Sequence, residues 1–331
     1  MRIVVIGASA GGVRALKRLA SELPAGLEAA ILITIHIAPS GPGLLPEILS
    51  GVGPLPSVHG YTGQPLQRGH VYVAPPDLHM LIGAQGRIRL SPGPKENGTR
   101  PAIDPMFRSA ALTFGPEVIG VVLTGHLDDG TGGLFAIKQC GGIAIVQDPT
   151  DAEVPSMPAH AAQHVAADYS VPLTELAPLL VRLIREPVKR EQRVMSDQLK
   201  IETQIMENPE EFSRAVTQIG DPSLLTCPEC HGTLLRVRDQ HLVRFRCHTG
   251  HGFSAQTLLD GLDEETEEAI WNAVRTLQEG AMLREHLAQH AQDAGSEDAA
   301  RTLLGEAQTK LQRAKTLRSI VARTRAAPDP S

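Results

Sequence analysis

Ser9 lies in the stretch Gly7-Ala8-Ser9-Ala10-Gly11, after a run of apolar residues and before a helix-like segment. This stretch matches Gly-x-Ser-x-Gly, in which small neighbours leave a serine hydroxyl exposed on a sharp turn from strand to helix. The following helix N-terminus would supply free N–H groups, which favour negative charge on a substrate oxygen. These residue types indicate a nucleophilic serine.

The same glycines suit a dinucleotide-binding loop, which needs Gly-x-Gly-x-x-Gly. Ser9 occupies the place of the second glycine, which lets the backbone approach a pyrophosphate. The next predicted strand ends in His36 rather than in the acid that holds a ribose. The sequence therefore argues against a nucleotide site.

A nucleophilic serine needs a base and an acid that orients the base. His36 stands at the end of the second predicted strand, and Asp128 and Asp129 follow another strand end. Each residue alone suits a structural role, as a hydrogen-bonded core histidine or a helix cap. Because carboxyl ends of parallel strands share one edge of a sheet, we expect Ser9, His36 and one of the aspartates to meet there.

The elements that must position these residues alternate along residues 1–186. Apolar runs predict strands at 2–6, 29–40, 70–74, 78–82, 86–91, 117–125 and 143–149. Helical patterns cover 12–22, 43–50, 104–114 and 130–142, a further helix lies within 156–171, and the last covers 173–186. The fold class is therefore α/β, with a doubly wound, mainly parallel sheet and helices on both faces.

Composition excludes several classes of protein. The 331 residues are 42% hydrophobic but only 3% aromatic, and the net charge is −6. This mild acidity and the scarcity of aromatic residues argue against nucleic-acid binding. We expect no membrane span and no signal peptide, and the four cysteines do not suggest a disulfide framework. A cytoplasmic protein fits these features best.

Six stretches within 1–186 resemble the catalytic domain of the CheB family, the chemotaxis protein-glutamate methylesterases. They occur in family order: IGASAGG, IHIAPS, GHVYVAPPDLHMLI, RPAIDPMFRSAA, VVLTGHLDDGTGGLFAIKQCGG and AIVQDPTDAEVPSMPAHA. The resemblance implies that Ser9 is the nucleophile, His36 the base and Asp129, rather than Asp128, the orienting acid.

The resemblance also implies an oxyanion hole formed by backbone N–H groups near Ala10 and His126. At His126-Leu127 the family often has Met-Gly, and we expect the His126 side chain to face solvent. Best-known members carry an N-terminal receiver domain that controls the esterase. This sequence resembles the stand-alone members, with its additional residues at the C-terminus.

A cysteine-rich stretch predicts a metal site. Cys227-x2-Cys230 is followed by Cys247 and His251, with a predicted β-hairpin over 233–246 between the two pairs. Three thiolates and an imidazole suit tetrahedral zinc, and a site filled by four protein ligands is structural. His248 and His231 compete for the fourth position, and the stand-alone relatives favour His251. No cofactor is expected in the chemistry.

The remaining sequence completes the predicted domain organisation. The catalytic domain covers 1–186, a charged and partly helical linker 187–222, a zinc-ribbon-like module 223–260, a helical hairpin 261–325 and a frayed tail 326–331. An apolar seam on the second long helix packs within the hairpin or, alternatively, forms a homodimer. The seam contains Ala300, Leu304, Ala307, Leu311, Ala314 and Val321.

Three functions are compatible with the sequence. The first is an esterase that removes γ-methyl groups from glutamates of a chemoreceptor-like protein and, as the resemblance allows, deamidates glutamine there. The second is a non-enzymatic signalling adaptor that binds other signalling proteins through its ribbon and C-terminal helices. The third is an esterase for a small ester. The intact Ser, His and Asp set argues against the adaptor.

Overall fold

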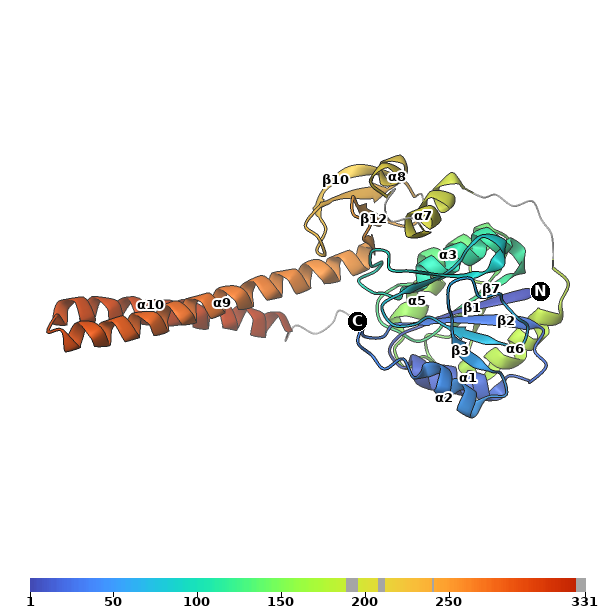
Figure 1. Ribbon diagram of the computed structural model, residues 1–331, viewed down its shortest axis with the longest axis horizontal. Helices are drawn as coiled ribbons and strands as arrows, with labels where there is room; N and C mark the ends of the chain where they lie inside the picture. Colours follow the sequence, from blue (N-terminus) through green and yellow to red (C-terminus); the bar gives the residue numbers. More distant parts are fainter. Residues whose placement is uncertain (189–195, 208–211, 240, 326–331) are drawn as a thin grey trace. The chain divides into compact units, whose positions relative to one another are not determined.

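A seven-stranded parallel sheet forms the centre of the N-terminal part of the chain (Figure 1). The computed structural model describes residues 1–188, 196–207, 212–239 and 241–325. Every neighbouring pair of strands in the sheet is parallel. In sheet order the strands are β3 (Ser57–His59), β4 (Val71–Val73), β2 (Ala29–Ile35), β1 (Arg2–Ala8), β7 (Val118–Val122), β8 (Ile143–Gln147) and β9 (Tyr169–Val171).

Helices cover both faces of this sheet, which confirms the predicted doubly wound fold. One face packs against α1 (Gly12–Glu22), α2 (Leu45–Val52) and α6 (Leu173–Arg185). The other packs against α3 (Ile103–Phe114), α4 (Thr131–Gln139) and α5 (Ser156–His164). All seven residues of β1 and of β2 are buried, since each strand presents apolar side chains to both layers.

Short elements escaped the sequence prediction. β3 and β9 have three residues each, too few for a recognisable pattern. The segments predicted near 78–82 and 86–91 are strands, β5 (His79–Ile82) and β6 (Ile88–Ser91), but they form a separate antiparallel hairpin outside the main sheet. One-turn 3₁₀ helices at Ala84–Gly86 and Gly115–Glu117 complete this part of the chain.

A four-stranded antiparallel sheet follows, and we call residues 220–254 the ribbon. Its strands are β10 (Gly220–Thr226), β11 (Thr233–Val237), β12 (Arg244–Cys247) and β13 (Gly252–Ser254). The predicted hairpin at 233–246 corresponds to β11 and β12, whereas the two outer strands were not predicted. The linker contains α7 (Asp197–Glu207), as expected, and α8 (Phe212–Ile219). The rest of the linker includes 189–195 and 208–211, which lie outside the described residues.

Two compact units divide the chain, Met1–Leu258 and Leu259–Ser331. The first contains the sheet, α7, α8 and the ribbon, and the second contains the long hairpin. The proposed domain boundaries at 186, 222 and 260 stay predictions. The tail predicted at 326–331 lies outside the described residues. No helix within the described residues is long and apolar enough to span a membrane.

The hairpin consists of α9 (Ala255–Asp293) and α10 (Glu297–Arg325), which lie side by side (Figure 1). Small buried residues recur along both helices every seven positions. The alanine positions of the predicted seam are buried, but Leu304 and Leu311 are 42% and 40% exposed. Small side chains let the helices approach closely, which leaves these leucines beside the seam. The buried positions are Val274, Ala281, Ala288, Ala300, Ala307, Ala314 and Val321.

Candidate active site and metal centre

Ser9 follows the last residue of β1 and begins the turn into α1. The Gly12 N–H donates to the Ser9 carbonyl at 2.8 Å, and Gly11 has a φ of 76°, a conformation that favours glycine. The Ser9 N–H donates to the carbonyl of Thr124, beyond the end of β7. The turn therefore fixes Ser9 beside the neighbouring strand.

Ser9, His36 and Asp129 form a continuous chain of polar contacts. His36 directly follows β2, and Asp129 lies in the loop between β7 and α4. His36 Nδ1 is 3.2 Å from Ser9 Oγ, and His36 Nε2 is 2.8 Å from Asp129 Oδ2. The side chains of His36 and Asp129 are 15% and 2% exposed. Because β2, β1 and β7 are adjacent in the sheet, the three residues meet at one edge.

Backbone and side-chain donors surround the Asp129 carboxylate. It accepts from Ile103 N–H at 2.7 Å and from Gly130 N–H at 2.9 Å, besides the contact with His36. Burial opposes ionisation, but the hydrogen bonds from His36, Ile103 and Asn97 outweigh it and lower the pKa of Asp129. An ionised carboxylate in this position can hold the imidazole in one tautomer and stabilise its cation.

Asp128 faces away from His36. Its Oδ1 accepts from the Ser254 and Thr257 hydroxyls at 2.7 and 3.0 Å. Of the two aspartates left open by strand-end reasoning, the one that contacts the histidine is Asp129. The other connects this loop to the segment where β13 ends and α9 begins.

The candidate oxyanion donors lie beside Ser9. The backbone of Ala10 is in the turn before α1, and His126 is in the β7–α4 loop with its side chain exposed, as expected. Among the described residues, neither backbone N–H donates to another protein group. Their role in an oxyanion hole stays a prediction.

Sequence reasoning missed Asn97. It allowed Asp104, in a stretch that resembles the family, to line the cleft and favoured a structural over a catalytic role for it. Asn97 Nδ2 donates to Asp129 Oδ1 at 2.8 Å and lies 3.3 Å from Asp104 Oδ2. Burial and the nearby charge of Asp129 raise the pKa of Asp104 to about 7. Ionisation in this cluster therefore favours Asp129 over Asp104. The Asn97-Gly98 dipeptide, a strong turn signal, was the available clue.

His79 is a buried structural histidine. Its Nδ1 accepts from Ala102 N–H at 3.1 Å, and its Nε2 lies 3.0 Å from the Pro94 carbonyl. Desolvation lowers the pKa of His79 to about 4, so the ring is neutral in the folded protein at neutral pH. It connects the loop before α3 to the β5–β6 hairpin.

This histidine should make stability depend on pH. At His79 the unfolded chain binds a proton near pH 6.5 and the folded chain only near pH 4. The contribution of His79 to the free energy of unfolding is therefore complete above pH 6.5 and is lost as pH falls toward 4. The free energy of unfolding should drop by about 3 kcal/mol over this window from His79 alone. Urea unfolding of the wild type and His79→Gln at pH 7 and pH 4.5 measures it. If the free energy of unfolding drops equally in both proteins, His79 is not the source of this pH dependence.

The predicted metal ligands form a compact cluster in the ribbon. The ligand atoms of Cys227, Cys230, Cys247 and His251 all lie within 4.8 Å of one another. Cys230 Sγ is 3.6 Å from Cys247 Sγ, and His251 Nδ1 is 3.7 Å from Cys227 Sγ and 3.5 Å from Cys247 Sγ. Tetrahedral zinc with Zn–S bonds of about 2.3 Å places neighbouring sulfurs about 3.8 Å apart.

The cluster therefore fits a zinc ion, which would stabilise the ribbon. Within the described residues, His251 belongs to the cluster, and the competing candidates His248 and His231 do not. The four ligands come from two turns, Cys227–Cys230 before β11 and Cys247–His251 between β12 and β13. Such an arrangement holds the ends of the ribbon strands together.

Comparisons with known proteins cover the N-terminal half of the chain. A family model described as CheB methylesterase matches residues 4–180. A Leptospira interrogans protein, named provisionally a protein-glutamate methylesterase/protein-glutamine glutaminase, is 38% identical over 180 residues, 54% of this chain and 93% of that protein. A Methanosarcina mazei protein with the same two names is 36% identical over 190 residues, 55% of this chain and 52% of its own length.

A solved structure agrees with these sequence matches. The CheB methylesterase catalytic domain of Thermotoga maritima is 34% identical, with a TM-score of 0.54, and the match covers 55% of this chain and 98% of that domain. The chain spans about half the length of the M. mazei relative and almost all of the isolated catalytic domain. The family model covers more than half of the chain and includes Ser9, His36 and Asp129. The chain belongs to the CheB methylesterase family.

Proposed function

We propose that this protein is a serine esterase that hydrolyses γ-methyl esters of glutamate on a chemoreceptor-like protein in the cytoplasm. The observation that carries the proposal is the chain of contacts from Ser9 through His36 to Asp129, with distances of 3.2 and 2.8 Å. The names of the relatives, protein-glutamate methylesterase and protein-glutamine glutaminase, supply the substrate class.

The geometry supports covalent catalysis in two steps. Asp129 holds the proton on His36 Nε2, so the unprotonated Nδ1 accepts the proton of Ser9 Oγ as that oxygen attacks the ester carbonyl. The protonated His36 then gives its proton to the departing methoxide, which releases methanol and leaves an acyl-enzyme. Water, deprotonated by His36, attacks the acyl carbon and frees Ser9 and the glutamate carboxylate.

The same residues can deamidate glutamine. Attack by Ser9 on a side-chain amide gives the same acyl-enzyme, and ammonia leaves in place of methanol. Neither reaction draws on the cysteine cluster, which lies in the ribbon. We propose a structural role for zinc there.

Methanol release from a methylated receptor fragment tests this function. The wild type should release methanol and leave free glutamate, and Ser9→Ala should not. If the wild type hydrolyses a small ester but does not demethylate the receptor fragment, the proposed substrate is wrong. A folded protein whose Ser9 does not react with a fluorophosphonate probe would overturn the esterase itself and favour the adaptor.

Gly125→Ala should impair the same reaction by displacing the nucleophile. A Cβ at position 125 would lie 2.7 Å from Ser9 Cβ and 2.7 Å from Met157 Cε, closer than carbon atoms approach. A displacement of about 1 Å at a reacting group lowers turnover about 100-fold, and we expect a loss of this size in kcat.

Gly51→Ala provides the matched control for this prediction. It makes the same change within α2, where a Cβ would meet no atom within 4 Å. Its kcat should equal that of the wild type. Equal kcat in both variants would show that Ser9 tolerates the added methyl group.

A further inference from the structure

Asn97 occupies a tight two-residue turn between Glu96 and Thr99. The backbones of Glu96 and Thr99 exchange hydrogen bonds of 3.2 and 3.1 Å, and φ is 51° at Asn97 and 71° at Gly98. Positive φ at both central residues defines a type I′ turn, which accepts Asn, Asp or Gly at the first position. The turn alone therefore does not require an amide at residue 97.

The ribbon holds this amide in place. The Ser254 N–H donates to Asn97 Oδ1 at 3.0 Å, and the Asn97 N–H donates to the Gly252 carbonyl at 2.8 Å. With its oxygen engaged by Ser254, the amide presents its NH₂ group to Asp129. Asn97 is 6% exposed, so water does not replace these contacts. Strand β13 thus sets the orientation of a donor to the candidate catalytic acid.

A buried ion network fixes the ribbon against the same turn. Glu96 Oε2 accepts from Arg246 Nη2 at 3.0 Å and from Arg108 Nη2 at 2.7 Å. Although burial opposes it, the two guanidinium groups hold the pKa of Glu96 far below its usual range. Arg246 directly precedes the candidate metal ligand Cys247 and also donates to the Gly250 carbonyl at 3.0 Å.

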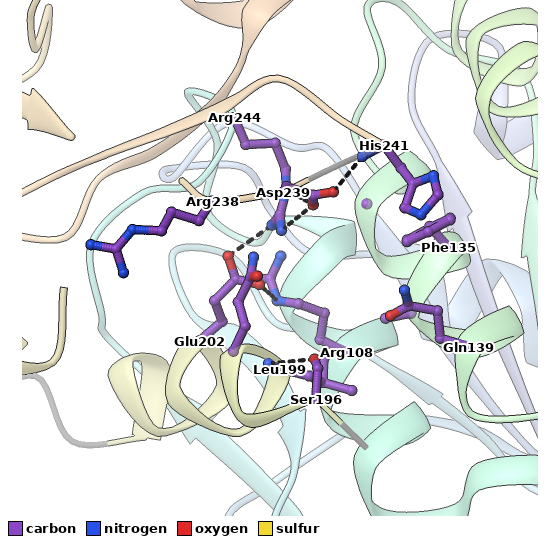
Figure 2. Close-up of a pocket in the computed structure, with 13 residues that line it drawn as sticks. Arg108, Phe135, Gln139, Ser196, Leu199, Glu202, Arg238, Asp239, His241 and Arg244 are labelled. Atoms are coloured by element: carbon purple, nitrogen blue, oxygen red, sulfur yellow. Dashed lines mark hydrogen bonds and ion pairs between the residues drawn. The ribbon is translucent and has the colours of Figure 1, made fainter. Parts of the chain in front are cut away.

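Further contacts join the ribbon to α7 and α4 around a cavity of about 260 Å³ (Figure 2). Arg244 of the ribbon pairs with Glu202 of α7 and with Asp239, each at 2.8 Å. The His241 ring lies 4.8 Å from the Phe135 ring of α4. The ribbon is therefore attached at both ends of β12. The adjacent strand β13, which contacts Asn97, is held in place by these attachments.

We propose that Asn97 is a positioning residue for Asp129 and that the ribbon, through β13, keeps it in position. This inference rests on the proposed esterase function. With the donor in place, Asp129 directs Oδ2 toward His36 while Oδ1 is held by Asn97. Without it, Oδ1 keeps only its backbone donors, Gly130 N–H at 2.9 Å and Asp104 N–H at 3.2 Å. The carboxylate is then held less firmly, and so is the orientation of His36 toward Ser9. Binding of substrate should be unaffected because Asn97 lies behind the acid.

Two substitutions that keep the turn test this role. Asn97→Gly removes the amide, and Asn97→Asp places a second carboxylate against Asp129. Each should lower kcat by about 10- to 100-fold, as loss of an orienting hydrogen bond does at other sites, while KM changes less than about twofold. Asn97→Asp should also shift the NMR signal of the proton between His36 and Asp129. Thr99→Ala, in the same turn, should match the wild type in each measurement.

A double-variant cycle tests the contribution of the ribbon. Cys227→Ser should loosen the ribbon and lower kcat in the wild-type background, but should have little further effect in Asn97→Gly. If Cys227→Ser does not fold, stepwise metal removal by a chelator replaces it. The His36–Asp129 proton signal should then decline with metal content in the wild type and be independent of it in Asn97→Gly. Additive losses in kcat, or a signal equally sensitive in both proteins, would refute the coupling.

The results separate this inference from the proposed function. If the wild type hydrolyses the ester and Asn97→Gly retains full kcat and an unchanged proton signal, the positioning role is wrong and the esterase stands. If the folded wild type hydrolyses no ester and Ser9 does not react with a fluorophosphonate, the function is wrong, and the positioning role falls with it.

Discussion

Ser9→Ala and His36→Ala should each lower kcat/KM on a methyl ester by about 10⁴- to 10⁶-fold while the protein stays folded. The first removes the attacking oxygen, and the second removes the side chain that hydrogen-bonds to both Ser9 and Asp129. Steady-state kinetics on a methylated receptor fragment, with circular dichroism as a check on folding, measures the effect.

The combined variant provides the stricter test. Because the two residues act as a unit, Ser9→Ala/His36→Ala should lose no more activity than the more damaging single change. Asp129→Asn should lower kcat by about 10⁴-fold, since an amide holds the wrong tautomer of His36. Ser21→Ala, which removes an exposed hydroxyl at the end of α1, should leave activity unchanged. Full activity in Ser9→Ala would exclude the covalent mechanism.

One zinc ion per chain should be found in metal-replete protein, and its removal should unfold the ribbon. A segment this small has little core of its own, and structural zinc supplies about 10–16 kcal/mol of apparent binding free energy in comparable sites. Elemental analysis gives the stoichiometry. Thermal unfolding with and without a chelator should show the loss of a stabilised module.

Substitutions identify the ligands. Cys227→Ser should lose zinc, whereas Cys140→Ala, at the end of α4 and outside the cluster, should keep a full equivalent. His251→Ala should lose it and His248→Ala should not. A full equivalent of zinc in Cys227→Ser would show that the site is misassigned. If His248→Ala loses zinc and His251→Ala keeps it, only the assignment of the fourth ligand is wrong.

Strand-end reasoning predicted the candidate active site because it depends on local pattern and simple topology. The apolar runs before Ser9 and His36 identify parallel strands, and parallel strands bring their carboxyl ends together. The choice between Asp128 and Asp129 did not follow from the pattern, since either side chain could turn toward the histidine. It came from the family resemblance, and the structure places Asp129 at His36 and Asp128 at Ser254.

The contacts between the ribbon and the turn that holds Asn97 could not be predicted from the sequence. Asn97 meets Ser254 across 157 positions, and Glu96 meets Arg246 across 150. A periodic pattern of apolar residues identifies a helix or a strand, but it does not predict a contact between residues this far apart in the sequence. The candidate triad lies within the predicted catalytic domain, 1–186. The partners of Asn97 and Glu96 in the ribbon do not, so a fragment ending at 186 would expose a buried carboxylate and free the turn.

Buried small residues recur every seven positions in the hairpin, and this spacing restricts how the length of the hairpin can vary among related chains. α9 is 39 residues long, about 58 Å, and one position in seven faces the seam on each helix. Inserting seven residues in α9 and seven in α10 would keep every alanine opposite the partner helix and extend the hairpin by about 10 Å. A seven-residue insertion in one helix alone would shift the facing alanines past one another along the axis. An insertion far from a whole number of helical turns would rotate the seam away from the partner helix. Changes in length that keep this packing are therefore expected in both helices together, for instance as seven residues in each.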